Sequence, residues 1–325
     1  MKIVHLVLSN VYAGIEQHVN ELVLNLEQES KTDVIIICNK EIASKFDSNN
    51  IQVINNFSRR SPIGLIKLLL KIHKIKPDII HTHGSKTTSV INVIKKFLPI
   101  KHVATAHGIK NKTSVYKKAT KLITVSQMVK ESIDASSVVI NNWYPPIVQD
   151  KKSLNNDYVL AVGRLEKVKG FDLLIQSWIN IKDNLIIIGS GKEYDSLINL
   201  ISQHNLDTKI QIIDEMSQED LVDYYKNASM LVISSRSEGG PRVALEALYQ
   251  EIPVISTNVG HMAEILPKEL LAEPDNLESL KDLIETYVGN ENYSQDSIYE
   301  YIKQEFSGIS QSKKILNIYR ELFVS

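Results

Sequence analysis

Short apolar runs alternate with segments of helical periodicity along the first half of the chain. The apolar runs have the length and composition of buried strands, and they predict strands over residues 2–8, 33–38, 51–54, 78–81, 102–106, 121–125 and 138–140. Between them, apolar residues recur every three or four positions, which predicts helices over 17–26, 63–75, 86–97 and 127–133. Strands that alternate with helices indicate βαβ units and a mostly parallel sheet.

The same alternation returns after an irregular stretch in the middle of the chain. Residues 141–146 end in Pro145 and Pro146, and residues 149–157 are polar, so we expect a domain boundary near residue 150. Strands are then predicted over 158–162, 184–188, 209–213, 230–233 and 253–256, and helices over 170–179, 194–204, 217–227, 241–249, 277–287 and 310–323. The sequence therefore predicts an α/β protein with two Rossmann-like parallel-sheet domains, 1–150 and 151–325, which face a ligand cleft at the carboxyl ends of the strands.

Composition and charge add two constraints. The chain of 325 residues carries 20 Lys and Arg against 11 Asp and Glu over residues 1–150, and 17 against 27 over residues 151–325. The two halves therefore have surfaces of opposite sign and different expected partners. The single cysteine, Cys38, lies in an apolar run and cannot form an internal disulfide, which fits a reducing cytosol. No apolar run approaches the 18 or so residues that a membrane span needs.

A basic segment over residues 59–76 has two interpretations. It contains Arg59 and Arg60, followed by a helical pattern in which lysines are spaced among leucines and isoleucines. The first interpretation is a helix that packs its apolar face on the sheet and keeps its lysines in water. The second is an amphipathic helix that binds an anionic membrane surface, and the positive charge of the whole half favours it.

The sequence around two glutamates, Glu238 and Glu246, predicts a ligand site. An apolar strand over 230–233 leads to Gly239 and Gly240, and Pro241 follows at the expected first turn of a helix. A helix start beside flexible glycines offers free N–H groups that suit a phosphate. The two carboxylates are separated by roughly 12 Å of helix rise. This pattern fits a ligand with a hydroxyl-bearing group at each end and a phosphate between them.

Two further loops are candidates for binding phosphate. Arg164 and Lys169 lie in the loop that follows the first strand of the second half, and together they would neutralise a diphosphate. The alternative is a solvated basic loop. Gly14 follows the first strand of the chain and precedes a helix, so it would let backbone N–H groups approach a phosphate. The alternative there is an ordinary connection between a strand and a helix.

The run from Gly189 to Gly191 partly matches a dinucleotide-binding fingerprint. The third glycine of the fingerprint is replaced by Tyr194, and Asp214 ends the next predicted strand, where a ribose-binding acid lies in dehydrogenases. A nicotinamide-dependent oxidoreductase therefore stays open as an alternative. The other interpretation is that Gly189 forms a tight turn near a nucleotide base.

Histidines follow two of the predicted strands. His81 and His83 form a His-x-His pair, but the nearby sequence offers no carboxylate or cysteine to complete a ligand set, so we expect no metal site. His107 stands at the end of its strand, directly before Gly108, which makes it the better candidate for contacting a substrate hydroxyl.

Taken in order, these motifs resemble one known family. The Glu-x7-Glu spacing of Glu238 and Glu246, the 163–170 loop, the 14–16 turn and the histidine motifs are similar to those of retaining glycosyltransferases of family 4, which have the GT-B fold. The resemblance implies that Glu246 holds the ribose and that Glu238 holds the donor sugar. It implies catalytic roles for His107 and Glu238. The implied donor-binding residues are Gly14, Arg164, Lys169, Gly189, Glu238, Gly239, Gly240, Pro241, Arg242, Val243 and Glu246.

The resemblance also implies an activity. It predicts a retaining, metal-independent transfer of a hexose-type sugar from a nucleotide-diphosphate sugar to a glycan or glycolipid, in cell-surface polysaccharide or lipopolysaccharide synthesis. No cofactor and no nucleic acid are expected, and the expected location is the cytoplasm, or the inner face of the membrane if residues 59–76 bind it. In this fold the last helix, about 310–325, often crosses back to the first domain. The alternatives are a nucleotide-sugar epimerase, a sugar phosphorylase, an NAD(P)-dependent oxidoreductase and a binding protein without activity.

Overall fold

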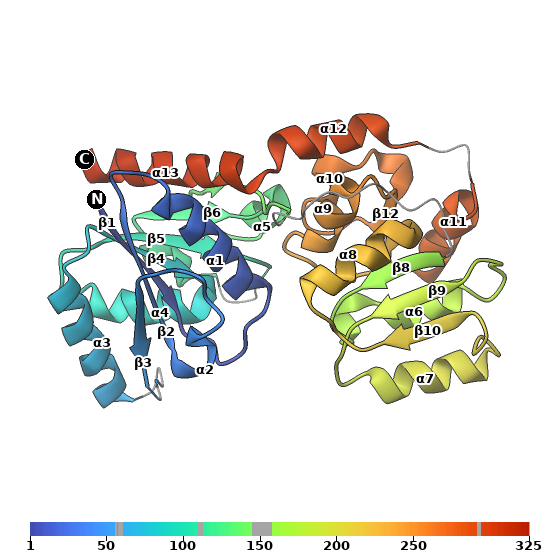
Figure 1. The fold of residues 1–325 in the computed structure, drawn as a ribbon, viewed down its shortest axis with the longest axis horizontal. Coiled ribbons are helices and arrows are strands. Elements are labelled where there is room, and N and C mark those ends of the chain that lie inside the picture. The colour runs from blue at the N-terminus through green and yellow to red at the C-terminus, as the bar shows by residue number, and fades with distance from the viewer. Residues whose placement is uncertain (56, 58–60, 110–112, 145–157, 291–293, 325) are drawn as a thin grey trace. The chain divides into compact units, whose positions relative to one another are not determined.

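The chain folds into two compact units, each built on its own parallel sheet (Figure 1). The computed structural model describes residues 1–55, 57, 61–109, 113–144, 158–290 and 294–324. The first unit comprises Met1–Asn142 together with Gly308–Ser325, and the second comprises Trp143–Ser307. The expected boundary at residue 150 lies outside the described residues. Because the last helix is part of the first unit, the second unit ends at Ser307 and not at residue 325.

The first unit contains a seven-stranded parallel sheet in the order β3-β2-β1-β4-β5-β6-β7. Its strands are β1 (Lys2–Val7), β2 (Asp33–Asn39), β3 (Ile51–Ile54), β4 (Ile79–His83), β5 (Lys101–Ala106), β6 (Lys121–Thr124) and β7 (Val138–Val139). Its helices are α1 (Gly14–Glu27), α2 (Lys40–Ala43), α3 (Pro62–Ile75), α4 (Gly84–Ile94), η1 (Tyr116–Lys118), α5 (Gln127–Glu131) and α13 (Gly308–Val324). The central strands are almost entirely buried, because helices cover both faces of the sheet.

The second unit repeats this plan with six parallel strands in the order β10-β9-β8-β11-β12-β13. Its strands are β8 (Tyr158–Val162), β9 (Leu185–Ile188), β10 (Ile210–Ile213), β11 (Ala228–Ile233), β12 (Val254–Thr257) and β13 (Leu271–Ala272). Its helices are η2 (Lys167–Lys169), α6 (Phe171–Ser177), α7 (Tyr194–Gln203), α8 (Gln218–Asn227), α9 (Arg242–Tyr249), α10 (Met262–Ile265), η3 (Lys268–Leu270), α11 (Leu277–Tyr287) and α12 (Asp296–Glu305). One continuous apolar core joins the sheet to these helices.

In each sheet the order of the strands reverses at one point, and a ligand can bind beside this point. In the first sheet the strand order reverses between β1 and β4, and in the second it reverses between β8 and β11. At such a switch point the two loops that leave the carboxyl ends of the strands run to opposite faces and open a crevice between them. The loops after β8 and β11 are those that carry Lys169 and Glu238.

The last helix, α13, packs on the first unit although it ends the chain. Asn25 Nδ2 of α1 donates to Ser312 Oγ at 3.1 Å, and Arg320 Nη2 donates to Glu29 Oε2 at 3.2 Å. Tyr319 is fully buried and its hydroxyl meets His81 of β4. The helix therefore supplies a core residue to a sheet that was formed by the opposite end of the sequence.

The predicted elements agree with the observed ones in type and order, with three differences. Helix α12 is not among the predicted helices, although Ile298, Tyr299 and Ile302 recur at helical spacing in its sequence. The short elements α2, α10 and β13 are also absent from the prediction, since they are too brief to show a period. Strand β4 extends to His83, so the whole His-x-His pair lies within the strand, whereas the predicted strand ends at His81.

Among the described helices, none has both the length and the apolar character needed to cross a bilayer.

Candidate active site

Three loops of the second unit meet at the carboxyl edge of its sheet, and glycines make the close approach feasible. A Cβ added at Gly189, after β9, would lie 1.9 Å from the carbonyl oxygen of Gly163, after β8. A Cβ at Gly170 would lie 2.0 Å from the carbonyl oxygen of Ser234, at the end of β11, and Gly170 also has a φ of +67°. Any larger residue would push these backbones apart. The glycines therefore hold the loops after β8, β9 and β11 in contact.

Lys169 and Glu238 form an ion pair in this loop cluster. Lys169 Nζ lies 2.6 Å from Glu238 Oε1, and the two side chains are 17% and 16% exposed. Ser235 Oγ donates to the same carboxylate oxygen at 2.8 Å. The lysine stem packs over Gly163, where an added Cβ would lie 3.1 Å from Lys169 Cε. The structure thus brings together one predicted phosphate-binding cation and one predicted sugar-binding carboxylate, from loops 69 residues apart in sequence.

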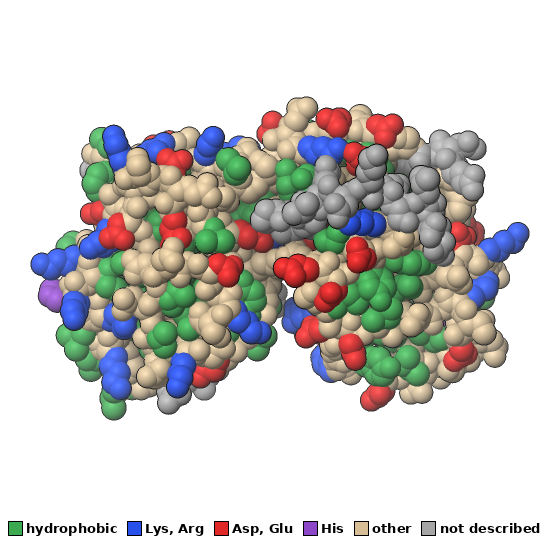
Figure 2. All heavy atoms as spheres, viewed as in Figure 1, with side chains coloured by type: hydrophobic (Ala, Val, Ile, Leu, Met, Phe, Trp, Pro, Cys, Tyr) green, Lys and Arg blue, Asp and Glu red, His purple; other side chains and the backbone are tan. Residues whose placement is uncertain are grey.

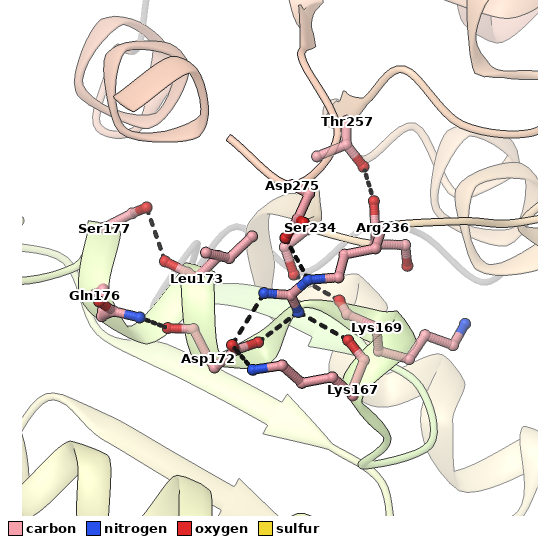
Figure 3. Close-up of polar contacts among 11 residues, drawn as sticks. Lys167, Lys169, Asp172, Leu173, Gln176, Ser177, Ser234, Arg236, Thr257 and Asp275 are labelled. Atoms are coloured by element: carbon pink, nitrogen blue, oxygen red, sulfur yellow. Dashed lines mark hydrogen bonds and ion pairs between the residues drawn. The ribbon is translucent and has the colours of Figure 1, made fainter. Parts of the chain in front are cut away.

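Arg236 braces the backbone on which both of these residues stand (Figure 3). Its guanidinium donates to Asp172 through Nη1 and Nη2, at 2.7 and 3.0 Å, and its Nε donates to Asp275 at 2.5 Å. Nη1 also donates to the carbonyl of Lys167 at 2.8 Å. In Figure 3 the ammonium group of Lys169 points away from this network. Arg236 therefore makes structural contacts, whereas Lys169 pairs with Glu238.

The pKa values of this brace follow from its contacts. Burial tends to raise the pKa of Asp172, but hydrogen bonds from Arg236 and Lys167 outweigh it, so the pKa of Asp172 is lowered. The hydrogen bond to Asp172 raises the pKa of Arg236 despite its partial burial. Both side chains are charged at neutral pH, as an ion pair with two parallel hydrogen bonds requires.

Glu246 lies in the middle of α9 and is only 6% exposed. Its carboxylate accepts hydrogen bonds from two side chains of α8, Tyr225 Oη at 2.9 Å and Gln218 Nε2 at 3.2 Å. Burial, and then the negative charge of Glu246, raise the pKa of Tyr225 well above its ordinary value. A carboxylate has about four lone-pair sites, so these two contacts leave it able to accept further hydrogen bonds.

The start of α9 differs slightly from the prediction. The helix begins at Arg242, and Pro241 is its N-cap with a φ of −67° and a ψ of 112°, so Pro241 precedes the first turn. Gly240 is contacted by the loop after β12, because a Cβ at Gly260 would lie 2.9 Å from Gly240 Cα. Arg242 and Val243 are half-buried in the first turn, beside Gly239 and Gly240.

Arg164 differs from Lys169 in its surroundings. Its Nη1 lies 2.7 Å from Glu166 Oε1, and its side chain is 64% exposed. The two predicted phosphate-binding cations are thus each paired with a separate carboxylate. An exposed ion pair of this kind contributes little to stability, so Arg164 can exchange Glu166 for another anion at low cost.

In the first unit, Gly14 is the first residue of α1 and follows a tightly held loop. Glu16 Oε2 accepts from the backbone N–H of Ala13 at 3.0 Å, and Asn39 Nδ2 donates to the carbonyl of Ser9 at 3.1 Å. A Cβ added at Gly14 would meet nothing within 4 Å. The packing of the chain itself therefore does not require a glycine here.

His107 belongs to a cluster of histidines at the carboxyl end of the first sheet. His83 Nδ1 lies 3.2 Å from His107 Nε2, and His83 Nε2 lies 3.1 Å from His5 Nδ1. The ring of His18, on α1, meets that of His107 edge-on with centroids 4.7 Å apart. His81 contacts Tyr319 Oη at 2.5 Å and Thr105 Oγ1 at 2.7 Å. Burial lowers the pKa of His5 to about 3 and that of His83 well below its ordinary value, so both rings are neutral.

Two groups of three histidines in this cluster have nitrogen atoms within 4.8 Å of one another. They are His5, His81 and His83, and His18, His83 and His107. Three neutral imidazoles are a ligand set that zinc accepts. The expectation of no metal site rests on the sequence near His81 and His83 alone, whereas His5 of β1, His18 of α1 and His107 after β5 complete these groups. Hydrogen bonds join rings within this cluster, His5 to His83 and His83 to His107.

Sequence reasoning did not identify several residues that shape the site. Tyr225, Gln218 and Ser235 hold the two predicted glutamates, and Arg236 with Asp172 braces the loops. Apart from Ser235, which lies three residues before Glu238 in the same loop, these contacts join residues on different elements, so no spacing in the sequence links those partners. The one available signal was that Arg236 and Asp172 both immediately flank predicted glycine loops.

Comparisons with known proteins agree with this geometry. The family described as "Glycosyl transferases group 1" matches residues 147–305, and the one described as "Glycosyltransferase Family 4" matches residues 12–142. An uncharacterized glycosyltransferase of Methanocaldococcus jannaschii is 32% identical over 235 residues, which cover 66% of this chain and 66% of that protein. The capsular polysaccharide biosynthesis glycosyltransferase CapM of Staphylococcus aureus is 26% identical over 280 residues, covering 70% and 72%.

The fold is similar to that of a solved structure. HepE of Anabaena, solved in complex with UDP and glucose, superposes with a TM-score of 0.84 at 17% identity, over 99% of this chain and 100% of that chain. This likeness supports the GT-B arrangement of two parallel-sheet α/β units. Since the two family matches account for almost all of both units, the chain belongs to the group 1 glycosyltransferases, within glycosyltransferase family 4.

Proposed function

We propose that the protein is a retaining glycosyltransferase that moves a hexose-type sugar from a nucleotide-diphosphate sugar to a glycan or glycolipid, in cell-surface polysaccharide or lipopolysaccharide synthesis. One observation carries the donor part of this proposal. The Lys169–Glu238 pair lies where the loops after β8 and β11 meet, and the helix that follows bears the buried carboxylate of Glu246. Ligands of open parallel sheets bind at this switch point.

The hydroxyl-binding roles go to the two glutamates. In the proposal Glu246 accepts hydrogen bonds from the ribose hydroxyls, beside those that it accepts from Tyr225 and Gln218. Glu238 accepts from hydroxyls of the donor sugar, and Ser235 keeps its carboxylate oriented. Because Glu246 is held from α8, it is positioned before a donor binds, which reduces the entropy lost on binding.

In the proposal Lys169, Arg164 and the start of α9 bind the negatively charged diphosphate. Both cations are paired with carboxylates, and a diphosphate would give each a more highly charged partner. When Lys169 turns to phosphate, Glu238 becomes available to the sugar. Positive charge placed at the leaving phosphate oxygen stabilises the transition state, so the proposed reaction needs no metal. The sugar is attacked on the face from which the diphosphate departs, and His107 contacts it near the reacting carbon.

The relatives support the substrate class. HepE was solved with UDP-glucose as well as with UDP, and CapM is named for capsular polysaccharide biosynthesis. Family membership leaves the nicotinamide alternative without support, and the partial fingerprint at Gly189 is explained by its close approach to Gly163.

The test is a donor panel. The protein is titrated by calorimetry with UDP-, GDP-, ADP- and CMP-sugars, with EDTA present throughout. We expect one of these four classes of nucleotide sugar to bind. Glu246→Gln should weaken its binding by about 1–3 kcal/mol, or roughly 5- to 150-fold, because the ribose loses a charged acceptor. Asp214→Asn, at the end of β10, is the control and should bind normally.

The same titrations decide the other parts of the proposal. Binding that requires Mg²⁺ would refute metal independence, and binding by none of the donors would refute the donor class. Incubation of the bound donor with water or a glycan mixture, followed by NMR of the anomeric proton, gives the stereochemistry. An epimerised sugar or a free sugar phosphate would point instead to an epimerase or a phosphorylase.

We also propose that α3 places the protein at the inner, cytoplasmic face of the membrane. Only Leu68 and Ile72 of α3 are buried, and Ile63, Ile66 and Leu70 are 66%, 55% and 61% exposed. These three lie along one outer face of the helix, as their spacing requires. Figure 2 shows lysine and apolar side chains together over α3 at the lower left. Exposed apolar residues beside lysines are the pattern of a helix lying on anionic lipid.

Co-sedimentation with anionic vesicles tests the membrane proposal. The double variant Lys67→Glu and Lys74→Glu should bind phosphatidylserine vesicles far more weakly than the wild type, since each lysine near the surface contributes about 1 kcal/mol. Lys313→Glu with Lys314→Glu, on α13, makes the same change of charge elsewhere and should leave binding intact. Equal binding of all three proteins would refute this proposal. Arg59 and Arg60 of the predicted basic segment lie outside the described residues.

A further inference from the structure

Three histidines of the first unit form an end-to-end hydrogen-bonded chain that ends at His107. His5, on β1, shares its Nδ1 with Nε2 of His83, on β4, at 3.1 Å, and His83 shares its Nδ1 with Nε2 of His107, after β5, at 3.2 Å. The middle ring, His83, thus uses both of its nitrogens, one for each neighbouring ring. His81 stands beside the chain without joining it, because both of its nitrogens are taken by Tyr319 and Thr105.

The ring protons of the three hydrogen-bonded histidines can be placed in only two ways. A neutral imidazole carries one N–H, which donates, and one bare nitrogen, which accepts. Each contact between rings needs one donor and one acceptor, so fixing the proton on any ring fixes it on the other two. In one arrangement every ring is protonated on Nδ1, and in the other every ring is protonated on Nε2.

The buried end of the chain distinguishes these arrangements. His5 is completely buried, and its Nε2 has no hydrogen-bond partner among the described residues. If the rings carried their protons on Nε2, this end would be a stranded N–H group, and such orphaned donors are the rarer defect in protein interiors. If the rings carry them on Nδ1, the end is only a bare lone pair. The Nδ1 arrangement is therefore the more stable one.

We propose that His5 and His83 are positioning residues that hold His107 as its Nδ1–H tautomer, so that His107 offers its substrate a hydrogen-bond donor and not a base. This inference rests on the proposed function for the nature of the substrate, which is an oxygen of the donor sugar or of its leaving phosphate. An N–H suits such an oxygen, and it suits a same-face reaction in which the departing phosphate, not a side chain, assists the acceptor.

The neutral state of His5 and His83 also supports an Nδ1–H tautomer for His107. Burial lowers the pKa of His5 to about 3, and burial followed by the neighbouring histidines lowers that of His83. A proton added to Nε2 of His107 would oppose the N–H of His83. The whole chain would then have to reverse and strand an N–H at His5. The chain therefore also resists conversion of His107 to the imidazolium form.

The decisive measurement is spectroscopic and needs no donor. The full chain, labelled with ¹⁵N-histidine and kept in EDTA at pH 7.5, is observed by long-range ¹H–¹⁵N correlation, which distinguishes the two tautomers of each ring. His107→Gln assigns the signals of His107. We expect His83 and His107 to be protonated on Nδ1, the minor tautomer of free histidine. A proton on Nε2 of His107, or nitrogen shifts that change when EDTA is added to untreated protein, would overturn the proposal.

Two matched variants separate positioning from general packing. Glutamine at 83 reproduces the Nε2 end of the ring but has no atom at Nδ1, so His83→Gln should return His107 to the Nε2–H tautomer. His102→Gln changes another buried histidine of the same sheet, which contacts Thr82 at 2.8 Å and is not part of the hydrogen-bonded chain of histidines. This control should leave the signals of His107 unchanged. The same change of tautomer in both variants would contradict a specific role for His83.

Kinetics with the donor found in the panel complete the test. His83→Gln should lower kcat/KM about tenfold, the value of one hydrogen bond, while His102→Gln changes it less than twofold. If every donor fails, the proposed function is wrong but the tautomer result stands. If the donor turns over and His107 is protonated on Nε2, the positioning role alone is wrong.

Discussion

The hydrogen bond between Tyr225 and Glu246 offers a direct test of how the proposed ribose-binding carboxylate is held. The change Tyr225→Phe removes only the hydroxyl, so it leaves the buried ring and creates no cavity of consequence. Tyr225 is 1% exposed and Glu246 is 6% exposed, and the oxygen atoms are 2.9 Å apart. A buried hydrogen bond to a charged acceptor contributes about 1.5–3 kcal/mol, and we expect this loss in the free energy of unfolding.

A double-mutant cycle isolates the pair. In a Glu246→Gln background the acceptor is neutral, and the hydroxyl then contributes about 0.5–1.5 kcal/mol. The cost of Tyr225→Phe should therefore be about 1 kcal/mol or more smaller in that background. The difference measures the interaction of the hydroxyl with the negative charge.

The assay is urea unfolding followed by tryptophan fluorescence. Both tryptophans of the chain, Trp143 and Trp178, are buried and belong to the second unit, so the signal reports on the unit that contains the pair. With a slope of about 2 kcal/mol/M, a loss of 2 kcal/mol lowers the midpoint by about 1 M. An unchanged midpoint, or the same loss in both backgrounds, would refute the assignment of Tyr225 as the residue that holds Glu246.

Further outcomes follow from the same contacts. Gly14→Ala should raise the free energy of unfolding by about 0.4–1 kcal/mol, because the site is helical and open, yet weaken donor binding in calorimetry; unchanged affinity would show that no phosphate approaches this loop. Arg236→Lys should lose about 1.5–3 kcal/mol in urea unfolding, since an ammonium cannot replace the fork on Asp172, and a loss under 0.5 kcal/mol would contradict the bracing role. Because the pKa of Asp172 is lowered, its pair stabilises the fold above the ordinary aspartate pKa of about 3.9 and loses this effect as the pH falls below it. The stability difference between the wild type and Asp172→Asn should therefore shrink between pH 5 and pH 3, and a constant difference would argue against the charged pair.

Local signals in the amino-acid sequence predict the two parallel sheets and the loops that carry the candidate site. Apolar runs, helical periods and glycines are local signals, and they placed Gly14, Lys169, Glu238 and Glu246 after strands or in a helix, as observed. Parallel strands align their carboxyl ends, so residues that follow strands were expected at the same edge of each sheet. The prediction omits α12, which is polar apart from Ile298, Tyr299, Tyr301 and Ile302.

Which side chains contact one another depends on the packing of the elements in three dimensions. The pairing of Lys169 with Glu238 depends on the strand order, which reverses between β8 and β11 and brings two distant loops together. The histidine chain depends on the neighbouring positions of β1, β4 and β5, and its burial depends partly on α13, which supplies Tyr319 from the other end of the sequence. Contacts of this kind arise from packing between elements, and packing has no period that a single sequence can display.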